Sequence, residues 1–241
     1  MDRELVFDED YLYFYLGWLT DEASDAQADL IWRLLELEQG MELLDLACGH
    51  GRIANRLAAR GARTTGLDAT PLFLELARKD AAARGVEVEY VEGDMRELPW
   101  DGRFDCVLSW FTSFGYFDDD DNRTVLREAH RALKPGGTLL IENNNLAALL
   151  PLWRPWNVTE RNGDFMIDRS RFDPTTSRGL TERIVLRGGR TRRFDFTVRM
   201  FIAAELGDWL RDAGFSDVEF YDGGGEPLTA EGRRMITIAR R

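Results

Sequence analysis

Cysteine and histidine are scarce in this chain, which excludes several kinds of site. The 241 residues include two cysteines, Cys48 and Cys106, and two histidines, His50 and His130. The cysteine spacing fits no zinc motif, so we expect no metal site. Two isolated cysteines are typical of reduced thiols, which favours a cytoplasmic protein without disulfides.

Long apolar runs and an excess of positive charge are also missing. No stretch approaches the roughly 18 apolar residues that span a bilayer, and the charged start, Met1-Asp2-Arg3-Glu4, is not typical of a signal peptide. The formal net charge is -12, whereas a nucleic-acid partner requires a basic surface that contacts phosphates. We therefore expect neither a membrane nor a nucleic acid as a partner.

Helix and strand signals alternate regularly over the first 150 residues. Hydrophobic residues make up 44% of the chain, which is ordinary for a globular protein. Strands are expected at 42–46, 63–67, 86–90, 104–110 and 138–142, and helices from Ser24 or Asp25, from about Arg52, after Thr70-Pro71 and from 118–122. This alternation predicts a doubly wound α/β fold, in which helices cover both faces of a parallel sheet.

The pattern changes between about residues 143 and 201. Three strand-like runs, at 164–172, 180–186 and 191–200, are separated by turn signals. Arginines alternate with apolar residues there, so we expect a small antiparallel β insertion with one packed and one solvated face. It would cap a pocket or form a homo-oligomer interface. A helix at 203–213 and a terminal hairpin complete a single domain of residues 1–241.

A glycine turn after an apolar strand carries the most information. Asp45 lies within that strand, Gly49-His50-Gly51 forms the turn, and Asp68 ends the next strand 19 residues after Gly49. The dinucleotide-binding fingerprint has the same spacing, so an NAD-dependent oxidoreductase is one interpretation. Against it, the chain has no Tyr-x-x-x-Lys pair and no convincing histidine for hydride transfer. Gly93-Asp94 also ends a third strand, where it offers an acceptor for an adenine amine.

Four motifs in order resemble those of the class I S-adenosylmethionine-dependent methyltransferases that act on small molecules. Residues 44–51 are similar to their first motif, Gly66-Leu67-Asp68 to the second, Gly93-Asp94-Met95 to the third, and 133–137 to the turn before their fifth strand. The resemblance covers about residues 40–142. It implies S-adenosylmethionine as the cofactor and a Rossmann-like, seven-stranded, mostly parallel sheet whose last strand is antiparallel.

The resemblance places the cofactor along the carboxyl ends of these strands. Glycines at 49 and 51 would let the backbone approach the methionine moiety, and Asp68 would accept the ribose hydroxyls. Asp94 and Met95 would define adenine, and Arg52 would bind the cofactor carboxylate. The expected cofactor-binding residues are Tyr11, Asp45, Ala47, Gly49, Gly51, Arg52, Asp68, Asp94, Met95 and Trp110.

Three further segments are expected at the acceptor side, because ligands bind outside the carboxyl ends of parallel strands. An aromatic N-terminal lid at about 1–36 would place Tyr11 or Tyr15 near the sulfonium, unless its aromatics only pack a helix onto the sheet. The run 109–117 would supply a pocket wall that suits a methylated ammonium. Strand five ends in Glu142-Asn143-Asn144, where Glu142 would orient or deprotonate an acceptor.

These assignments predict methyl transfer to a small-molecule acceptor, with an amine nitrogen favoured over a hydroxyl oxygen. The catalytic candidates are Tyr15, Tyr116 and Glu142, and the substrate-binding candidates are Phe117 and Asn144. No catalytic dyad is evident, which favours nitrogen because a neutral amine needs little acid–base help. A non-catalytic protein that binds the same cofactor, as a sensor or assembly module, stays as an alternative beside the oxidoreductase.

Overall fold

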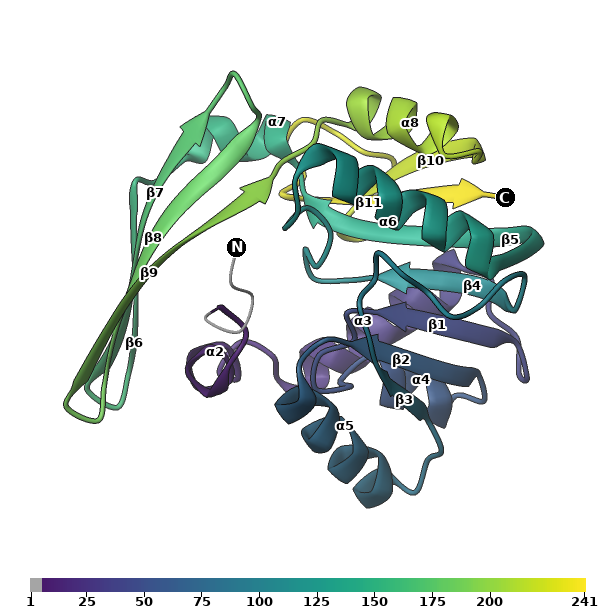
Figure 1. Cartoon of the computed structure of the whole chain (residues 1–241), viewed down its shortest axis with the longest axis horizontal. Coiled ribbons are helices and arrows are strands. Elements are labelled where there is room, and N and C mark those ends of the chain that lie inside the picture. The colour runs from purple at the N-terminus through teal and green to yellow at the C-terminus, as the bar shows by residue number, and fades with distance from the viewer. Residues whose placement is uncertain (1–5) are drawn as a thin grey trace.

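A seven-stranded sheet forms the centre of the molecule in the computed structural model, which describes residues 6–241 (Figure 1). The strand order is β10-β11-β5-β4-β1-β2-β3. Strands β1 to β5 run parallel, and β11 is antiparallel to both of its neighbours. The predicted fold class is therefore confirmed. The strands are β1 (Glu42–Leu46), β2 (Arg63–Asp68), β3 (Glu89–Glu92), β4 (Phe104–Ser109), β5 (Leu133–Asn144), β10 (Ser216–Asp222) and β11 (Arg234–Arg240).

Helices cover both faces of this sheet because successive side chains of a strand point to opposite faces. Leu44 and Leu46 of β1 pack in the same apolar cluster as side chains of α6 and α8. Leu43, whose side chain points to the opposite face, packs against α3 and α4. The helices around the sheet are α3 (Asp21–Leu34), α4 (Ala54–Ala59), α5 (Pro71–Arg84), α6 (Asp119–Ala132), α8 (Ala203–Asp212) and the short α7 (Leu146–Leu149) with η1 (Leu150–Leu152).

Some element boundaries differ from those predicted. The cap of α3 is Thr20, whose hydroxyl accepts the Ala23 N–H, whereas Ser24 is buried inside the helix and Asp25 pairs with Arg56. Strand β3 begins at Glu89 and not at 86, because its pairing with β2 starts at Glu89, opposite Thr65. Hydrophobic alternation therefore located these elements, whereas a side-chain cap and strand pairing decided where they begin.

The insertion forms a separate four-stranded antiparallel sheet, which we call the cap (residues 156–199). It consists of β6 (Trp156–Arg161), β7 (Asp164–Asp173), β8 (Arg178–Arg187) and β9 (Arg190–Arg199) in sequential order. Figure 1 shows the cap as a long twisted sheet that extends away from the main sheet. Three of its strands were predicted. Strand β6 was missed because it is an edge strand whose side chains are mostly exposed, so it shows no core pattern.

The arginines of the cap do not share one solvated face as expected. Arg183 is buried on the face turned toward the main domain. Arg187 and Arg192 form ion pairs with aspartates of the N-terminal segment. Only part of the set, including Arg169 and Arg193, lies on the outer face, where both pair with Glu182. Homo-oligomer formation through the cap stays a prediction.

Helix α2 (Glu9–Tyr15) lies between the cap and the main sheet (Figure 1). Phe14 packs against Met166 and Val185 of the cap, and the Tyr13 hydroxyl donates a hydrogen bond of 3.0 Å to the Arg161 carbonyl. The predicted lid therefore rests on the cap. Its first five residues lie outside the described part of the chain. Among residues 6–241, no helix has the length and apolar content needed to cross a bilayer.

Gly115 joins the cap to the main domain. Its carbonyl accepts the Arg199 N–H at 2.7 Å, and a Cβ at this position would lie 2.7 Å from the Arg199 carbonyl oxygen. Its φ of +115° also disfavours a side chain. The end of β9 can therefore approach the loop after β4 this closely only because residue 115 is a glycine.

We predict that Gly115→Ala lowers the free energy of unfolding by about 2 kcal/mol or more, since strain at positive φ adds to a backbone clash. Gly40→Ala is the matched control, because Gly40 has a φ of +85° but no atom within 4 Å of its Cβ position. The control is expected to cost about 1 kcal/mol. Urea denaturation measures both, and equal losses would contradict the role of the close approach.

Candidate functional site

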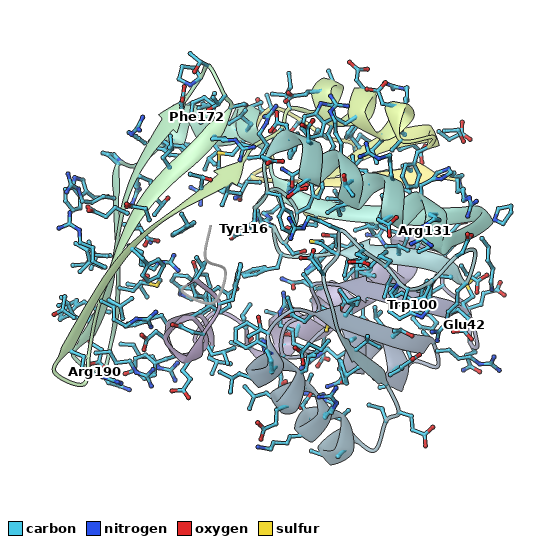
Figure 2. The ribbon with its side chains drawn as sticks, viewed as in Figure 1. Glu42, Trp100, Tyr116, Arg131, Phe172 and Arg190 are labelled. Carbon is cyan, nitrogen blue, oxygen red and sulfur yellow. The ribbon has the colours of Figure 1, made fainter. Side chains whose placement is uncertain are left out.

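A cavity of about 860 Å³ lies between the carboxyl ends of the parallel strands, helix α2 and the inner face of the cap. Figure 2 places Tyr116 in this region, between the two sheets. The predicted site residues that line the cavity are Tyr11, Tyr15, Asp45, Ala47, Gly49, Arg52, Asp68, Met95, Trp110, Tyr116, Phe117 and Asn144. Gly51, Asp94 and Glu142 are not among its lining residues.

Asp68 connects the ends of the first two strands. One carboxylate oxygen accepts the Gly49 N–H at 2.8 Å, and the other accepts the Thr70 N–H at 2.8 Å. Burial raises the pKa of Asp68, and hydrogen bonds from Gly49, Thr70 and Ala69 oppose that shift. Asp68 also lines the cavity. The carboxylate therefore holds the glycine turn and also faces the cavity.

Gly51 has a different explanation from the one expected. A Cβ there would lie 2.3 Å from the Tyr90 hydroxyl oxygen and 2.8 Å from the Ala77 Cβ. The Tyr90 hydroxyl in turn donates to the Asn55 side chain at 2.6 Å. Close packing of the turn against α5 and β3 therefore requires this glycine, whereas Gly49, with a φ of +57°, lines the cavity.

Two opposite charges are buried beside the glycine turn. Asp45 is 3% exposed, and burial raises its pKa to about 7, although Arg52 opposes the shift. Arg52 donates from Nη1 to the Gln27 side-chain oxygen at 2.7 Å, while its Nη2 is buried without a hydrogen-bond partner in the described residues. An unpaired buried donor is costly, so this nitrogen is suited to an anionic ligand group.

Gln27 was missed by the sequence reasoning, although it organises this corner. Its side-chain oxygen accepts hydrogen bonds from Arg52 and, at 3.0 Å, from the Trp110 indole nitrogen. It therefore fixes two predicted site residues from helix α3. A polar residue on a helix face gives no signal in the sequence that would separate it from an exposed one.

The Glu142 carboxylate is engaged by other residues of the protein. Its carboxylate accepts the Phe111 N–H at 2.8 Å and is held by both ends of the Arg234 guanidinium. Arg234 also donates to Thr112 Oγ1 at 2.8 Å and to Asn144 Oδ1 at 2.7 Å. Phe111 and Thr112 have φ values of +62° and +58°, which are unfavourable for residues with side chains. Glu142 and Arg234 thus hold the strained turn that presents Phe111 and Thr112 to the cavity.

Asp94 is engaged away from the cavity. Arg96 donates to its carboxylate from Nη2 at 2.7 Å and from Nε at 3.1 Å, and Arg96 also pairs with Asp121. The adjacent Gly93 and Met95 line the cavity. The expected role of Asp94 in binding adenine stays a prediction. Asp118 accepts the Asp121 N–H at 2.9 Å as the N-cap of α6, which gives this aspartate a local structural role.

Aromatic side chains form one wall of the cavity. Tyr11 and Tyr15 stack with their ring centroids 4.3 Å apart, and Phe7 meets the edges of Tyr11 and Tyr116 at 5.4 and 5.1 Å. Burial raises the pKa of Tyr11 and of Tyr116 above that of a free phenol. These aromatics therefore line the cavity, and do not only attach a helix to the sheet.

The cap contributes a second wall, whose individual residues were not among the predicted site residues. Its cavity-lining residues include Asp168, Ser170, Thr181, Arg183 and Phe196. The polar residues form short runs, at 168–171 in β7 and at 181–183 in β8. Such runs place polar side chains on both faces of the sheet, so the sequence does not show which face meets a ligand.

Known proteins share this architecture. A family described as a methyltransferase domain matches residues 43–137. Demethylmenaquinone methyltransferase of Thermus thermophilus is 40% identical over 122 residues, and the match spans 47% of this chain and about half, 54%, of that protein. The cypemycin N-terminal methyltransferase of a Streptomyces species is 31% identical over 217 residues, which are 84% of each chain.

A solved methyltransferase structure is similar to this chain over nearly the whole length of both chains. The amino pentose methyltransferase of Micromonospora echinaspora, solved with S-adenosylmethionine bound, has a TM-score of 0.67 and 26% identity, with 98% of each chain covered. The cypemycin relative exceeds 30% identity over most of both chains. The chain therefore belongs to the class I S-adenosylmethionine-dependent methyltransferases.

Proposed function

We propose that this enzyme transfers the methyl group of S-adenosylmethionine to an amine nitrogen of a small acceptor, with a hydroxyl oxygen as the less favoured alternative. When bound, the cofactor would supply an activated methyl group, which the amine lone pair would take up with release of the neutral thioether. The ammonium product would then lose a proton to water. Family membership supports a methyltransferase over an NAD-dependent oxidoreductase or a non-catalytic sensor.

The preference for nitrogen rests on the hydrogen bonds and ion pair that already engage Glu142. A hydroxyl must lose its proton to become a good nucleophile, whereas a neutral amine already has a lone pair. Glu142, the candidate base, is held by Arg234 and by the Phe111 N–H. Tyr11 and Tyr116 have raised pKa values, and burial together with Arg52 lowers the pKa of His50 to about 4. Glu142, the two tyrosines and His50 therefore offer no strong base, which favours an amine.

The remaining residues have roles that suit this reaction. The residues that fit the cofactor are Arg52 for its carboxylate, Asp45 for its ammonium, Asp68 for its ribose hydroxyls and Gly49 for close backbone approach. The faces of Tyr11 and Tyr15 would lie against the positive charge and exclude water from the reacting groups. Tyr116, Phe117 and Asn144 would bind the acceptor.

The acceptor suggested by a relative is an amino sugar. The Micromonospora echinaspora protein is named as an amino pentose methyltransferase, and it aligns with 98% of this chain. The Thermus thermophilus relative acts on a demethylmenaquinone, as its name says, but aligns with 47% of the chain. The full-length likeness therefore supports a ring amine as the acceptor class.

We predict that a molecule with both groups is methylated on nitrogen. The probe trans-2-aminocyclohexanol carries an amine and a hydroxyl on adjacent ring carbons. It would be incubated with the enzyme and S-adenosylmethionine beside a panel of amino sugars, and the products analysed by tandem mass spectrometry. N-methylated products are expected, and O-methylated products alone would contradict the proposed acceptor atom.

We expect Arg52→Gln to weaken S-adenosylmethionine binding by about tenfold or more, because a charge-assisted bond to the cofactor carboxylate is lost. Arg60→Gln is the matched control, since Arg60 pairs with Asp29 at the surface. Isothermal titration calorimetry measures both affinities. Unchanged affinity in the Arg52 variant would show that its Nη2 binds nothing in the cofactor.

The pKa of Asp45, about 7, predicts a pH-dependent cofactor affinity. Below pH 7 the carboxyl is protonated and neutral, whereas above pH 7 it attracts the cofactor ammonium. The affinity of the wild type should therefore rise by about tenfold between pH 6 and pH 8. Asp45→Asn should remove this part of the dependence in calorimetric titrations, and an unchanged pH profile in the variant would assign the effect to another group.

A further inference from the structure

Two polar pairs stand side by side on the inner face of the cap. The register of β7 and β8 pairs Asp168 with Arg183, and Ser170 with Thr181. All four side chains line the cavity. The hydroxyl oxygens of the second pair are 2.9 Å apart. The cap therefore presents hydrogen-bonding groups to the cavity, opposite the glycine turn of the main domain.

Arg183 and Asp168 form a bidentate ion pair. The Arg183 Nε donates to Asp168 Oδ1 at 2.7 Å, and Nη2 donates to Oδ2 at 2.8 Å. The Arg183 side chain is only 4% exposed, and its guanidinium lies 4.9 Å from the centre of the Phe196 ring. A buried ion pair contributes little stability compared with apolar side chains of the same volume. Its position in a cavity wall is better explained by binding of a ligand.

The same arginine also positions a predicted catalytic residue. Its Nη2 donates to the Tyr15 hydroxyl oxygen at 3.3 Å. Because that oxygen accepts the Arg183 N–H, the Tyr15 hydroxyl hydrogen is directed to another group. Tyr15 stacks on Tyr11 at the aromatic wall. The cap pair is thus linked to the wall at which the methyl group would be transferred.

Hydrogen-bonding capacity remains on both members of the pair. The bonds of Arg183 use Nε and Nη2, so the two Nη1 hydrogens are left to donate. Each Asp168 oxygen accepts one bond from Arg183 and has a further lone pair. The Asp168 carboxylate can thus accept, and Arg183 Nη1 can donate, one further hydrogen bond. This combination is complementary to a ligand that offers an N–H or O–H next to an oxygen.

We propose that Asp168 and Arg183 recognise the acceptor, and that they select an amine with a hydroxyl on the neighbouring carbon. This inference rests on the proposed function and narrows its substrate class. Asp168 accepts a hydrogen bond from the amine N–H, and Arg183 donates to the hydroxyl oxygen on the neighbouring carbon. Ser170 and Thr181 take up the next polar group of the ring. Arg183 is also a positioning residue for Tyr15.

The test compares two ligands that differ by one hydroxyl. Binding of trans-2-aminocyclohexanol and of cyclohexylamine to protein loaded with S-adenosylhomocysteine is titrated by saturation-transfer difference NMR. The wild type is expected to bind the amino alcohol about tenfold more tightly, the value of one hydrogen bond to a charged group. In Asp168→Asn and in Arg183→Lys the preference should fall to about twofold.

Glu182→Gln is the matched control. Glu182 pairs with Arg169 across the same two strands, one residue along in register and on the outer face. This variant should keep the tenfold preference, and all variants should bind S-adenosylhomocysteine within about twofold of the wild type, which shows that the cofactor half is folded. If either substitution prevents folding, the other one and the wild-type preference still carry the test.

Two results would overturn the inference. One is equal binding, or no binding, of the two ligands by the wild type, and the other is a preference that persists in both cap variants. Failure of the proposed function looks different, because the preference for the amino alcohol would hold while no N-methylated product forms when S-adenosylmethionine replaces the loaded product.

Discussion

The burial of Asp45 and Arg52 beside the glycine turn is the constraint on which the cofactor side of the cavity depends. Strand alternation places Asp45 on the face covered by α3 and α4, so its carboxylate is almost fully buried at the edge of the cavity. Burial then raises its pKa to about 7, and Arg52 is left with an unpaired Nη2. A ligand with an ammonium and a carboxylate satisfies both charges at once. The amino-acid end of the cofactor is such a ligand.

The cap wall, on the opposite side of the cavity, differs because its two charges neutralise each other. Asp168 and Arg183 satisfy each other, so the cap wall is neutral and stays intact without a ligand. The cofactor wall therefore gains stabilisation when charges are bound, whereas the cap wall offers hydrogen bonds with defined directions. This difference suits one wall to a ligand common to a whole family and the other to the choice among acceptors.

The sequence predicted the central sheet and the cofactor turn well, because both depend on local rules. Alternating apolar residues, a glycine turn and carboxylates that follow apolar runs can all be read from the printed sequence. The roles of Gly51 and Glu142 were not predictable in this way. Gly51 is a glycine because Tyr90, 39 positions along the chain, occupies the space beside it, and Glu142 is engaged because Arg234 arrives from the last strand. Such contacts between distant segments leave no periodic signal.

The part of the proposed acceptor side that α2 and the cap supply lies outside the region that the family has in common. The family match covers residues 43–137, which contain the glycine turn, Asp68 and the turn after β4. Tyr15 lies before this region, and Asp168 and Arg183 lie after it. Helix α2 and the cap contact each other through Phe14 and through ion pairs of Asp8 and Asp10. In the proposed function these two segments contribute jointly to the acceptor wall, so we expect a change of acceptor to involve both of them, while the cofactor site can remain the same.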